Sequence, residues 1–386
     1  MVPIQYNLRS LWVRKVTTIA TALGVTLVIF VFGAAQMLSA GMQRAMKISG
    51  RDDTAIVLRD GSDAELSSSF SADFVKLVSE RPEVKQGDGD AAVGEIVVVL
   101  TVELASGDGI SNLMVRGTPP EGYRFRKELK IVSGRMPTPG TSEVIVGKAI
   151  HGRFKGVRTG EQFEVRRNRP LKVVGVFSTG GSSYESEVWG DVDVVRTSLG
   201  REAVVSSARV RLRDGDQLQA FRSAVEADKR LGLDVMRETA YYEKQSEMTA
   251  GFLSGMGIAF AVLLSLAAMI FAAITMNGAV ANRTREIGTL RALGFSKLSI
   301  LTSFVLEAIF LALIGGAAGT ALVMLLGMFT FSTMNFQTFS EIVITFHATP
   351  GVIISALVFS VVMGLIGGLF PAIRASQVSP IEAMRA

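Results

Sequence analysis

Four long stretches of the chain contain only uncharged, mostly apolar residues. Each is longer than the roughly 20 residues that a helix needs to cross a hydrocarbon layer about 30 Å thick. We therefore expect four membrane-spanning helices, and the excess length predicts that the first and second continue beyond the membrane as a stalk. The stretches are 16–43, 248–282, 308–340 and 342–373, and the expected spans lie near 17–38, 255–277, 303–328 and 350–372.

Residues 45–247 instead mix charged and apolar positions, as a water-soluble domain does. Runs rich in Val and Ile and bounded by Gly, Asp or Pro predict strands, and apolar residues three or four positions apart predict helices. The fold class is thus an α-helical integral membrane protein with four transmembrane helices and a mixed α+β domain between the first and second. Strands are expected at 54–58, 95–104, 113–116, 143–146, 162–166, 171–177 and 204–212, and helices at 72–79 and 216–229.

The basic residues outside residues 44–247 indicate the orientation. There are nine of them, and the loop 331–349 contains none. Because Lys and Arg concentrate in cytoplasmic loops, both termini and the 280–298 loop are expected in the cytoplasm, and the large domain outside it. The nine residues are Arg9, Arg14, Lys15, Arg283, Arg285, Arg291, Lys297, Arg374 and Arg385.

The expected organisation follows from this topology. The α+β domain divides into a strand–helix–strand part at 53–104 and 204–238 and a β-rich insertion at 105–200. The segments are a cytoplasmic N-terminal segment (1–16), the first span and stalk (17–44), the outer α+β domain (45–247), the stalk and second span (248–282), a cytoplasmic helix (283–297), the third span (298–330), an outer loop (331–349), the fourth span (350–373) and a cytoplasmic C-terminal helix (374–386).

Two other classes of protein fit the sequence less well. Small residues near 34–35 and 39–40 resemble a signal-peptidase site, but the first stretch is too long for an ordinary signal sequence, so we expect it to remain. The net charge of +5 could suggest nucleic-acid binding. However, residues 44–247 hold 31 of the 40 basic and 31 of the 35 acidic residues, so the soluble domain is neutral and no nucleic-acid partner is expected.

Signatures of catalysis are missing from the sequence. There is no cysteine, and two histidines cannot form a His-Glu-x-x-His metal helix in this chain. The pair Gly147-Lys148 has Ser142 and Ala149 where a phosphate loop needs Gly and Ser or Thr. We expect no catalytic residue, metal or cofactor in this chain.

The spans contain two features with alternative interpretations. Glu307 is an acidic residue in the third apolar region, which makes it a functional candidate by default. The favoured alternative is that it lies at the membrane surface and pairs with a cytoplasmic Arg. The pairs Gly315/Gly319 and Gly364/Gly368 have the spacing of close helix contacts, either within the chain or at a seam between two copies.

The segment after the second span has its own pattern. Residues 283–294 predict a short amphipathic helix with Ile287, Leu290 and Leu293 on one face and Gly294 as the C-terminal stop. A plain positive-inside anchor would need the charges but not the apolar stripe. The segment consists of Arg283, Thr284, Arg285, Glu286, Ile287, Gly288, Thr289, Leu290, Arg291, Ala292, Leu293 and Gly294.

This segment resembles the MacB/FtsX/LolC superfamily of ABC transporter permeases. Glu307 with the following glycines resembles the third span of that family, and Phe370-Pro371 followed by Ser379-Pro380 resembles its C-terminal tail. The family usually has Asp where Ser379 stands, although Ser379 and Glu382 can still form a capping box. Weaker matches in the soluble domain, such as Gly117-Thr118-Pro119, resemble the periplasmic core domain of the family.

The resemblance implies an inner-membrane permease subunit of a bacterial ABC transporter. In the family, the segment that here comprises Arg283–Ala292 is the coupling helix that docks onto the ATPase. The MacB chain carries its ATPase ahead of the first span, whereas this sequence has no nucleotide site, so the resemblance implies a separate ATPase that binds ATP and magnesium, as in the LolC, FtsX and DevC branches.

The remaining implications of the resemblance concern partners and substrate. Two ATPase subunits and a second permease copy or paralogue are expected, with a periplasmic adaptor and an outer-membrane channel as further partners. Three functions stay open: export of a periplasmic substrate by movement of the outer domain, release of lipoproteins, and signalling to cell-wall hydrolases without transport.

Overall fold

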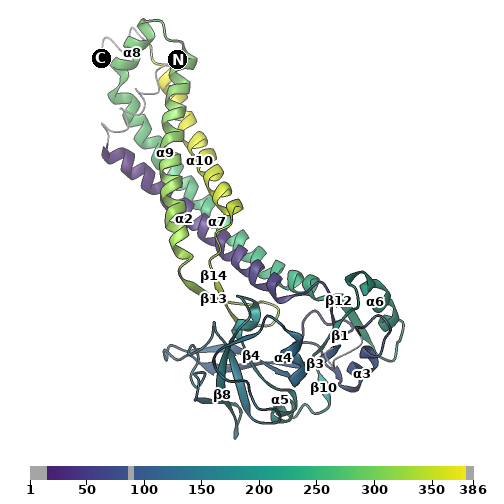
Figure 1. Cartoon of the computed structure of the whole chain (residues 1–386). Helices are drawn as coiled ribbons and strands as arrows, with labels where there is room; N and C mark the ends of the chain where they lie inside the picture. The colour runs from purple at the N-terminus through teal and green to yellow at the C-terminus, as the bar shows by residue number, and fades with distance from the viewer. Residues whose placement is uncertain (1–14, 86–90, 380–386) are drawn as a thin grey trace. The chain divides into compact units, whose positions relative to one another are not determined.

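The computed structural model describes residues 15–85 and 91–379 (Figure 1). By its internal contacts the chain forms two compact units. One comprises Met1–Ala40, Phe252–Phe329 and Phe346–Ala386, and the other comprises Gly41–Gly251 and Thr330–Thr345. The first is a helical bundle and the second is an α+β domain.

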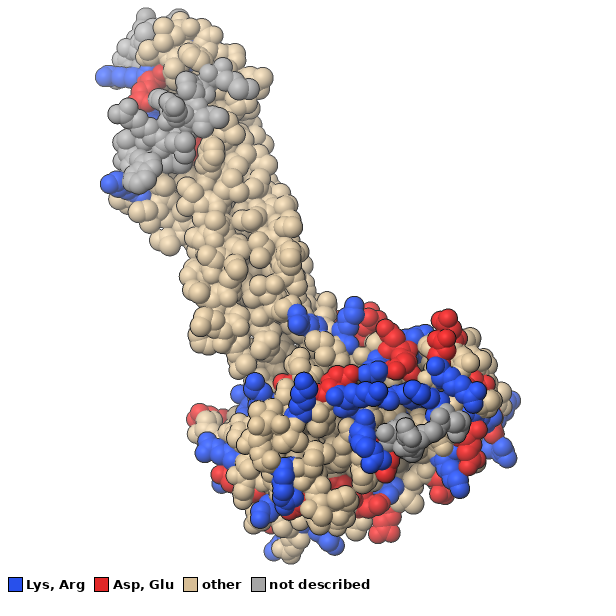
Figure 2. Space-filling view, in the orientation of Figure 1, with Lys and Arg blue, Asp and Glu red and all other residues tan. Residues whose placement is uncertain are grey.

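Among the described residues, four helices are long and apolar enough to cross a membrane: α2 (Lys15–Ser49), α7 (Glu238–Asn282), α9 (Lys297–Leu326) and α10 (Pro350–Ser376). The last nine residues of α2 and the first fourteen of α7 belong to the α+β unit, and the rest belong to the bundle. Their visible surface is almost free of charged residues in Figure 2, whereas the α+β domain is densely covered with both signs. At 1.5 Å per residue, the 45 residues of α7 span about 68 Å. This length is about twice the thickness of a hydrocarbon layer.

Local signals fix the helix ends within the bundle. The Ser296 hydroxyl accepts a hydrogen bond from the Ser299 N–H at 3.1 Å and caps α9. The Thr349 hydroxyl accepts from the Val352 N–H at 3.2 Å, and Pro350 occupies the first turn of α10.

The α+β domain is built on one ten-stranded sheet with the order β12-β1-β11-β3-β4-β9-β6-β8-β5, and β7 pairs with β8. The neighbours β4/β9 and β6/β8 are parallel and the other pairs are antiparallel. The strands are β1 (Thr54–Arg59), β3 (Ala92–Glu103), β4 (Ile110–Thr118), β5 (Lys130–Gly134), β6 (Glu143–Gly147), β7 (Gln162–Arg166), β8 (Arg169–Ser178), β9 (Glu187–Asp191), β11 (Ser207–Arg211) and β12 (Leu233–Arg237).

Two apolar cores flank this sheet. One, around Val57, Phe221 and Val235, is covered by α3 (Asp73–Ser79) and α6 (Leu218–Glu226). The other, around Val115, Val146 and Val173, includes residues of α5 (Val192–Leu199). Short pieces complete the domain: β2 (Phe70–Ser71) paired with β10 (Val204–Val205), α4 (Pro120–Phe125), and the 3-10 turns η1 (Ser183–Ser186) and η2 (Gly215–Gln217).

The fold class predicted from the sequence is confirmed by these elements. Several details differ. The expected outer loop 331–349 contains a hairpin, β13 (Thr330–Met334) and β14 (Glu341–Thr345), because Ile342 and Ile344 alternate onto one buried face. The short helices α4 and α5 and the strands β5 and β9 are additional to the predicted elements. Of the expected segments 1–16 and 374–386, residues 1–14 and 380–386 lie outside the described residues, and α10 ends at Ser376.

The hairpin β13–β14 packs on the α+β domain. The Val343 N–H donates to the Ser186 hydroxyl at 2.9 Å, and the Asn112 side chain donates to the Phe339 carbonyl at 2.7 Å. Arg153 forms an ion pair with Glu341. The connection between the third and fourth membrane helices is therefore part of the outer domain's structure.

Candidate functional site

The segment expected to couple to an ATPase forms the helix α8 (Thr284–Ala292). Ile287 and Gly288 are buried. Ile287 belongs to an apolar cluster with Val280 of α7, Ile300 and Phe304 of α9, and Ala372 and Ala375 of α10. This cluster anchors α8 to three membrane helices, and it leaves Arg285, Glu286, Thr289 and Ala292 exposed on the opposite face.

The C-terminal end of α8 corrects one detail of the expected apolar face. Leu293 is 73% exposed and lies beyond the last helical residue, so it does not share the buried face with Ile287 and Leu290. Gly294 follows with a φ of 93°, the left-handed conformation expected of a glycine stop. The Arg291 side chain donates to the Phe295 carbonyl at 3.1 Å and so holds this turn together.

Glu307 lies in α9 and is only 7% exposed. Its carboxylate is 3.6 Å from the guanidinium of Arg283, which immediately precedes α8, and Arg283 is also 3.6 Å from Glu286. Arg283 therefore joins the start of α8 to the third membrane helix. Glu307 is thus paired with an Arg beside α8, and its position at the cytoplasmic membrane surface stays a prediction.

The four glycines singled out from their spacing lie between helices of the same chain. A Cβ atom at Gly315 or Gly319 would lie 2.7 Å from the Ala22 carbonyl oxygen or 2.8 Å from the Thr26 carbonyl oxygen of α2. A Cβ at Gly364 or Gly368 would lie 2.5 Å or 2.3 Å from the Cβ atoms of Ala312 and Ala308 of α9, respectively. The glycines thus permit backbone contact between α9, α2 and α10.

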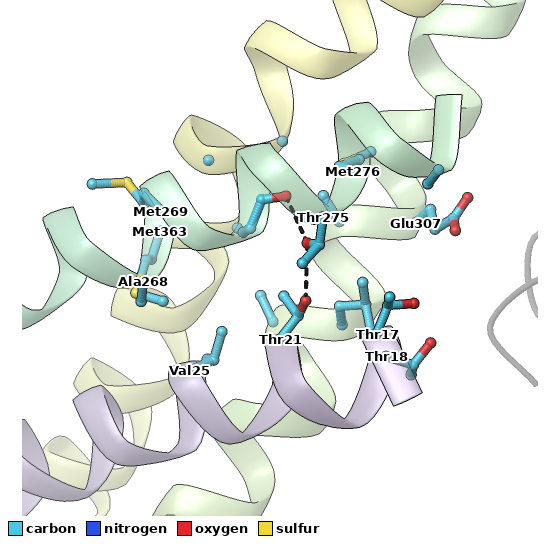
Figure 3. Close-up of a pocket in the computed structure, with 18 residues that line it drawn as sticks. Thr17, Thr18, Thr21, Val25, Ala268, Met269, Thr275, Met276, Glu307 and Met363 are labelled. Carbon is cyan, nitrogen blue, oxygen red and sulfur yellow. Dashed lines mark hydrogen bonds between the residues drawn. The ribbon is translucent and has the colours of Figure 1, made fainter. Parts of the chain in front are cut away.

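A small cavity lies among α2, α7, α9 and α10 (Figure 3). The Thr21 and Thr275 hydroxyls are 3.2 Å apart and hydrogen-bonded across it, and Glu307 lies on its wall. Most of the remaining wall consists of Met, Ala, Val, Leu and Gly. The cavity therefore places a few polar groups in an otherwise apolar bundle, beside the ion pair that holds α8.

The α+β domain contains a second cluster, which was not predicted from the sequence. Three guanidinium groups and four carboxylates are buried together, four of them on β3, β4, β9 and β11 and the others in adjoining loops and at the start of α7, and none of the seven residues is more than 5% exposed. They are Arg116, Arg126, Arg209, Glu65, Glu95, Glu187 and Glu238. Buried charges of this kind are stable only when each is paired and hydrogen-bonded.

Arg116 of β4 pairs with three of the four carboxylates. It donates to Glu187 at 2.7 and 2.9 Å, to Glu65 at 2.9 and 3.2 Å, and to Glu95 at 2.9 Å. Burial alone would raise the pKa of Glu65, but the nearby guanidinium groups of Arg116 and Arg209 hold the pKa of this carboxyl well below its usual range. The Glu65 carboxylate is therefore kept charged by direct pairing with these two guanidinium groups.

Both units of the chain match known protein families. Residues 16–228 match the family model of the MacB-like periplasmic core domain, and residues 258–380 match that of the FtsX-like permease C-terminal domain. The chain belongs to the MacB/FtsX-like family of ABC transporter permeases. Family members work with an ATPase.

Two relatives show the extent of the similarity. The permease is 24% identical to "Uncharacterized ABC transporter permease YknZ" of Bacillus subtilis, and the alignment covers 99% of this chain and 98% of that protein. It is 26% identical to "Macrolide export ATP-binding/permease protein MacB" of Burkholderia cenocepacia, over 97% of this chain. The permease spans only 57% of the length of that MacB protein.

Solved structures of two outer domains were also similar. The crystal structure of the extracellular domain of YknZ from Gram-positive bacteria gives a TM-score of 0.36 at 21% identity, covering 48% of this chain and 100% of that one. The periplasmic region of MacB from Actinobacillus actinomycetemcomitans gives 0.37 at 15% identity, covering 50% and 92%.

Proposed function

We propose that this permease couples ATP hydrolysis on a separate ATPase subunit to movement of its outer domain. The movement would act on a substrate that is already outside the cytoplasm and drive its export. Two copies of the chain, or one copy and a paralogue, would assemble with two ATPase subunits that bind ATP and magnesium. An adaptor protein and an outer-membrane channel would complete the export path.

The exposed polar face of α8 is the observation that carries this proposal. Ile287 fixes the helix to α7, α9 and α10, while the side chains of Arg285 and Glu286 are exposed on the opposite face, where another protein surface can reach them. A force applied to α8 would therefore be passed to three membrane helices at once. The ion pair between Arg283 and Glu307 supports the same role, because it limits rotation of α8 relative to α9.

The length of α7 supports the second half of the proposal. The helix begins at Glu238, immediately after strand β12 of the sheet, and it runs without a break to Asn282, just before α8. A single unbroken helix can transmit a tilt or displacement along its axis without an intervening loop.

The proposal predicts that the exposed face of α8 is required to stimulate the ATPase. Arg285→Ala and Glu286→Ala should reduce ATP hydrolysis when the permease is reconstituted in lipid nanodiscs with its ATPase subunit. Both side chains are exposed and neither belongs to the apolar cluster that anchors α8, so the fold of the bundle should be retained. The measurement is the ATPase rate with each variant, compared with that of the ATPase alone.

Arg374→Ala serves as the matched control, because Arg374 is exposed near the end of α10 and outside α8. Stimulation by this variant should equal that of the wild type. Full stimulation by both α8 variants would contradict the coupling role. Binding of the ATPase to each nanodisc sample, measured separately, distinguishes lost docking from lost stimulation after docking.

A further inference from the structure

The buried ion cluster of the α+β domain has one member on a stalk helix. Glu238 is the first residue of α7 and is 2% exposed. One carboxylate oxygen accepts from Arg209 Nε of β11 at 2.8 Å and from the Tyr184 hydroxyl of η1 at 3.3 Å. Its other oxygen accepts from the backbone N–H of Arg51, two residues after the end of α2, at 3.2 Å. Glu238 thus bonds to the sheet, to η1 and to the end of the other stalk helix.

The end of α2 is held in the same place by its backbone. A Cβ atom at Gly50 would lie 2.7 Å from the Cα atom of Thr239 and 2.8 Å from the Glu238 carbonyl oxygen, so these two segments of the backbone touch where only glycine fits. Ser49, the last residue of α2, accepts from the Ser183 N–H at 2.9 Å. Both stalk helices therefore meet the sheet at one point.

The next turn of α7 adds two tyrosines to this point. The Tyr242 hydroxyl accepts from Arg209 Nη2 at 3.0 Å and lies 2.8 Å from the Tyr184 hydroxyl. The Tyr241 hydroxyl accepts from the Glu65 N–H at 3.1 Å. Along this part of α7, residues 241, 242, 245 and 246 are buried whereas residues 243, 244 and 247 are exposed.

The contacts of this junction join charged and polar groups that are buried. A buried charge that moves away from its partner loses a directional hydrogen bond and is left unpaired in an apolar interior, which is strongly unfavourable. The start of α7 can therefore shift relative to the sheet only if several buried charges lose their partners together.

We propose that Glu238, supported by Tyr241 and Tyr242, is the positioning residue that fixes both stalk helices to the outer domain. Glu238 makes the ends of α2 and α7 and the strands around β11 a single rigid body. This inference rests on the proposed function, because the junction matters to transport only if the helices transmit movement to the domain. The junction is separate from the coupling helix α8, because Glu238, Tyr241 and Tyr242 lie at the opposite end of α7.

The junction can be tested with spin labels, since the chain has no cysteine of its own. Labels are attached at Glu247→Cys, on the exposed face of α7, and at Lys172→Cys, on the exposed face of β8. Pulsed electron paramagnetic resonance then gives the distance distribution between them in the full chain in nanodiscs. The parent protein should give a single narrow distance distribution. The Glu238→Gln variant should give a broad one, because it removes the charge that pairs with Arg209.

Glu243→Gln is the matched control, because Glu243 lies on the same helix, is exposed and carries the same charge. It should leave the distribution narrow. A second variant, Tyr242→Phe, removes one hydroxyl of the junction without removing a charge, and it should broaden the distribution less than Glu238→Gln. Distributions for both junction variants that match the control would overturn the proposal.

A separate measurement distinguishes this inference from the proposed function. Chains with the single label at Lys172→Cys report the distance between the outer domains of two copies, with and without ATP bound to the assembled ATPase. An ATP-dependent change that is present in Glu243→Gln and lost in Glu238→Gln supports both proposals. If ATP changes the distance between the two copies in none of the proteins, the proposed coupling is contradicted. The distance distribution between the two labels on one chain still decides whether Glu238 fixes the junction.

Discussion

The carboxylate of Glu95 lies at the centre of the buried cluster and has no exposed surface. Arg126 donates to both of its oxygens at 2.8 Å, and Arg116 and the Thr118 hydroxyl add further bonds. Burial raises the pKa of Glu95, but the guanidinium groups of Arg126, Arg209 and Arg116 outweigh this and lower it from 4.5 to about 2. The folded domain therefore favours the charged form of this residue.

This shift predicts a loss of stability in acid. Glu95 has a lower pKa in the folded than in the unfolded chain, so its contribution is complete above pH 4.5 and disappears as the pH falls towards about 2. The free energy of unfolding of the outer domain should fall over this range. Unfolding by urea at a series of pH values, followed by the fluorescence of buried Trp189 in a Trp12→Phe background, measures it.

Other carboxylates also titrate in acid, so the test compares variants. Glu95→Gln should lower the free energy of unfolding at neutral pH by about 3–5 kcal/mol, because it leaves buried guanidinium groups without their partner. The difference between this variant and the parent should narrow as the pH falls. Glu103→Gln, on the same strand but with an exposed ion pair to Lys155, should change little at any pH. A difference that stays constant with pH would contradict the assignment.

At the scale of single elements, the alternation along a strand predicted its apolar face but not the burial of its charged face. The alternation of apolar and charged residues at 209–212 predicts that Val210 and Leu212 lie on one face and Arg209 on the other. Val210 and Leu212 do belong to one apolar core, whereas Arg209 belongs to the buried ion cluster. The sequence could not reveal that the second face is also buried, because α7 and the residues around Glu65 cover it from distant parts of the chain. The sequence offered one signal for the buried charges. Glu95 comes directly before an apolar run and Arg116 directly after one.

Short helices show a different limit of sequence analysis. The helix α5 has clear signals at both ends: the Asp191 carboxylate caps it by accepting from the N–H groups of residues 193 and 194, and Gly200 ends it with a φ of 66°. Its eight residues are too few for a convincing periodicity on their own. The long membrane helices could be predicted because length and lack of charge alone distinguish them.

The packing of α9 gives a prediction at this scale. Gly319→Ala should destabilise the bundle by about 1–3 kcal/mol, because the new methyl group would press against the Thr26 carbonyl oxygen, a backbone atom that cannot rotate away. Gly255→Ala is the control, since no atom lies within 4 Å of the site and alanine favours a helix. Thermal unfolding in detergent measures both.

The same pair of variants tests the alternative that these glycines form a seam between two copies. In that case Gly319→Ala would weaken association of the chains, which can be measured as the mass of the detergent-solubilised particle, without lowering the stability of a single chain. A stability loss with unchanged mass is the outcome expected from contact between α9 and α2.

At the scale of the whole molecule, function depends on which unit faces the cytoplasm. A permease of this family can be driven by a cytoplasmic ATPase only if α8 is on the inner side. The nine basic residues outside the large domain all lie in segments next to the spans and on one predicted side, whereas the β13–β14 connection has none. The charge distribution thus predicts that α8 and the α+β domain lie on opposite sides of the membrane.

This assignment can be tested with two single cysteines introduced into the cysteine-free chain. Thr289→Cys lies on the exposed face of α8, and Asp108→Cys lies in an exposed turn of the outer domain. In intact cells whose outer barrier, if present, is permeable to small reagents, a membrane-impermeant maleimide should label residue 108 at once. It should label residue 289 only after the cytoplasmic membrane is opened. The reverse order would invert the topology and remove α8 from the reach of an ATPase, so this one experiment decides whether the coupling proposal is physically possible.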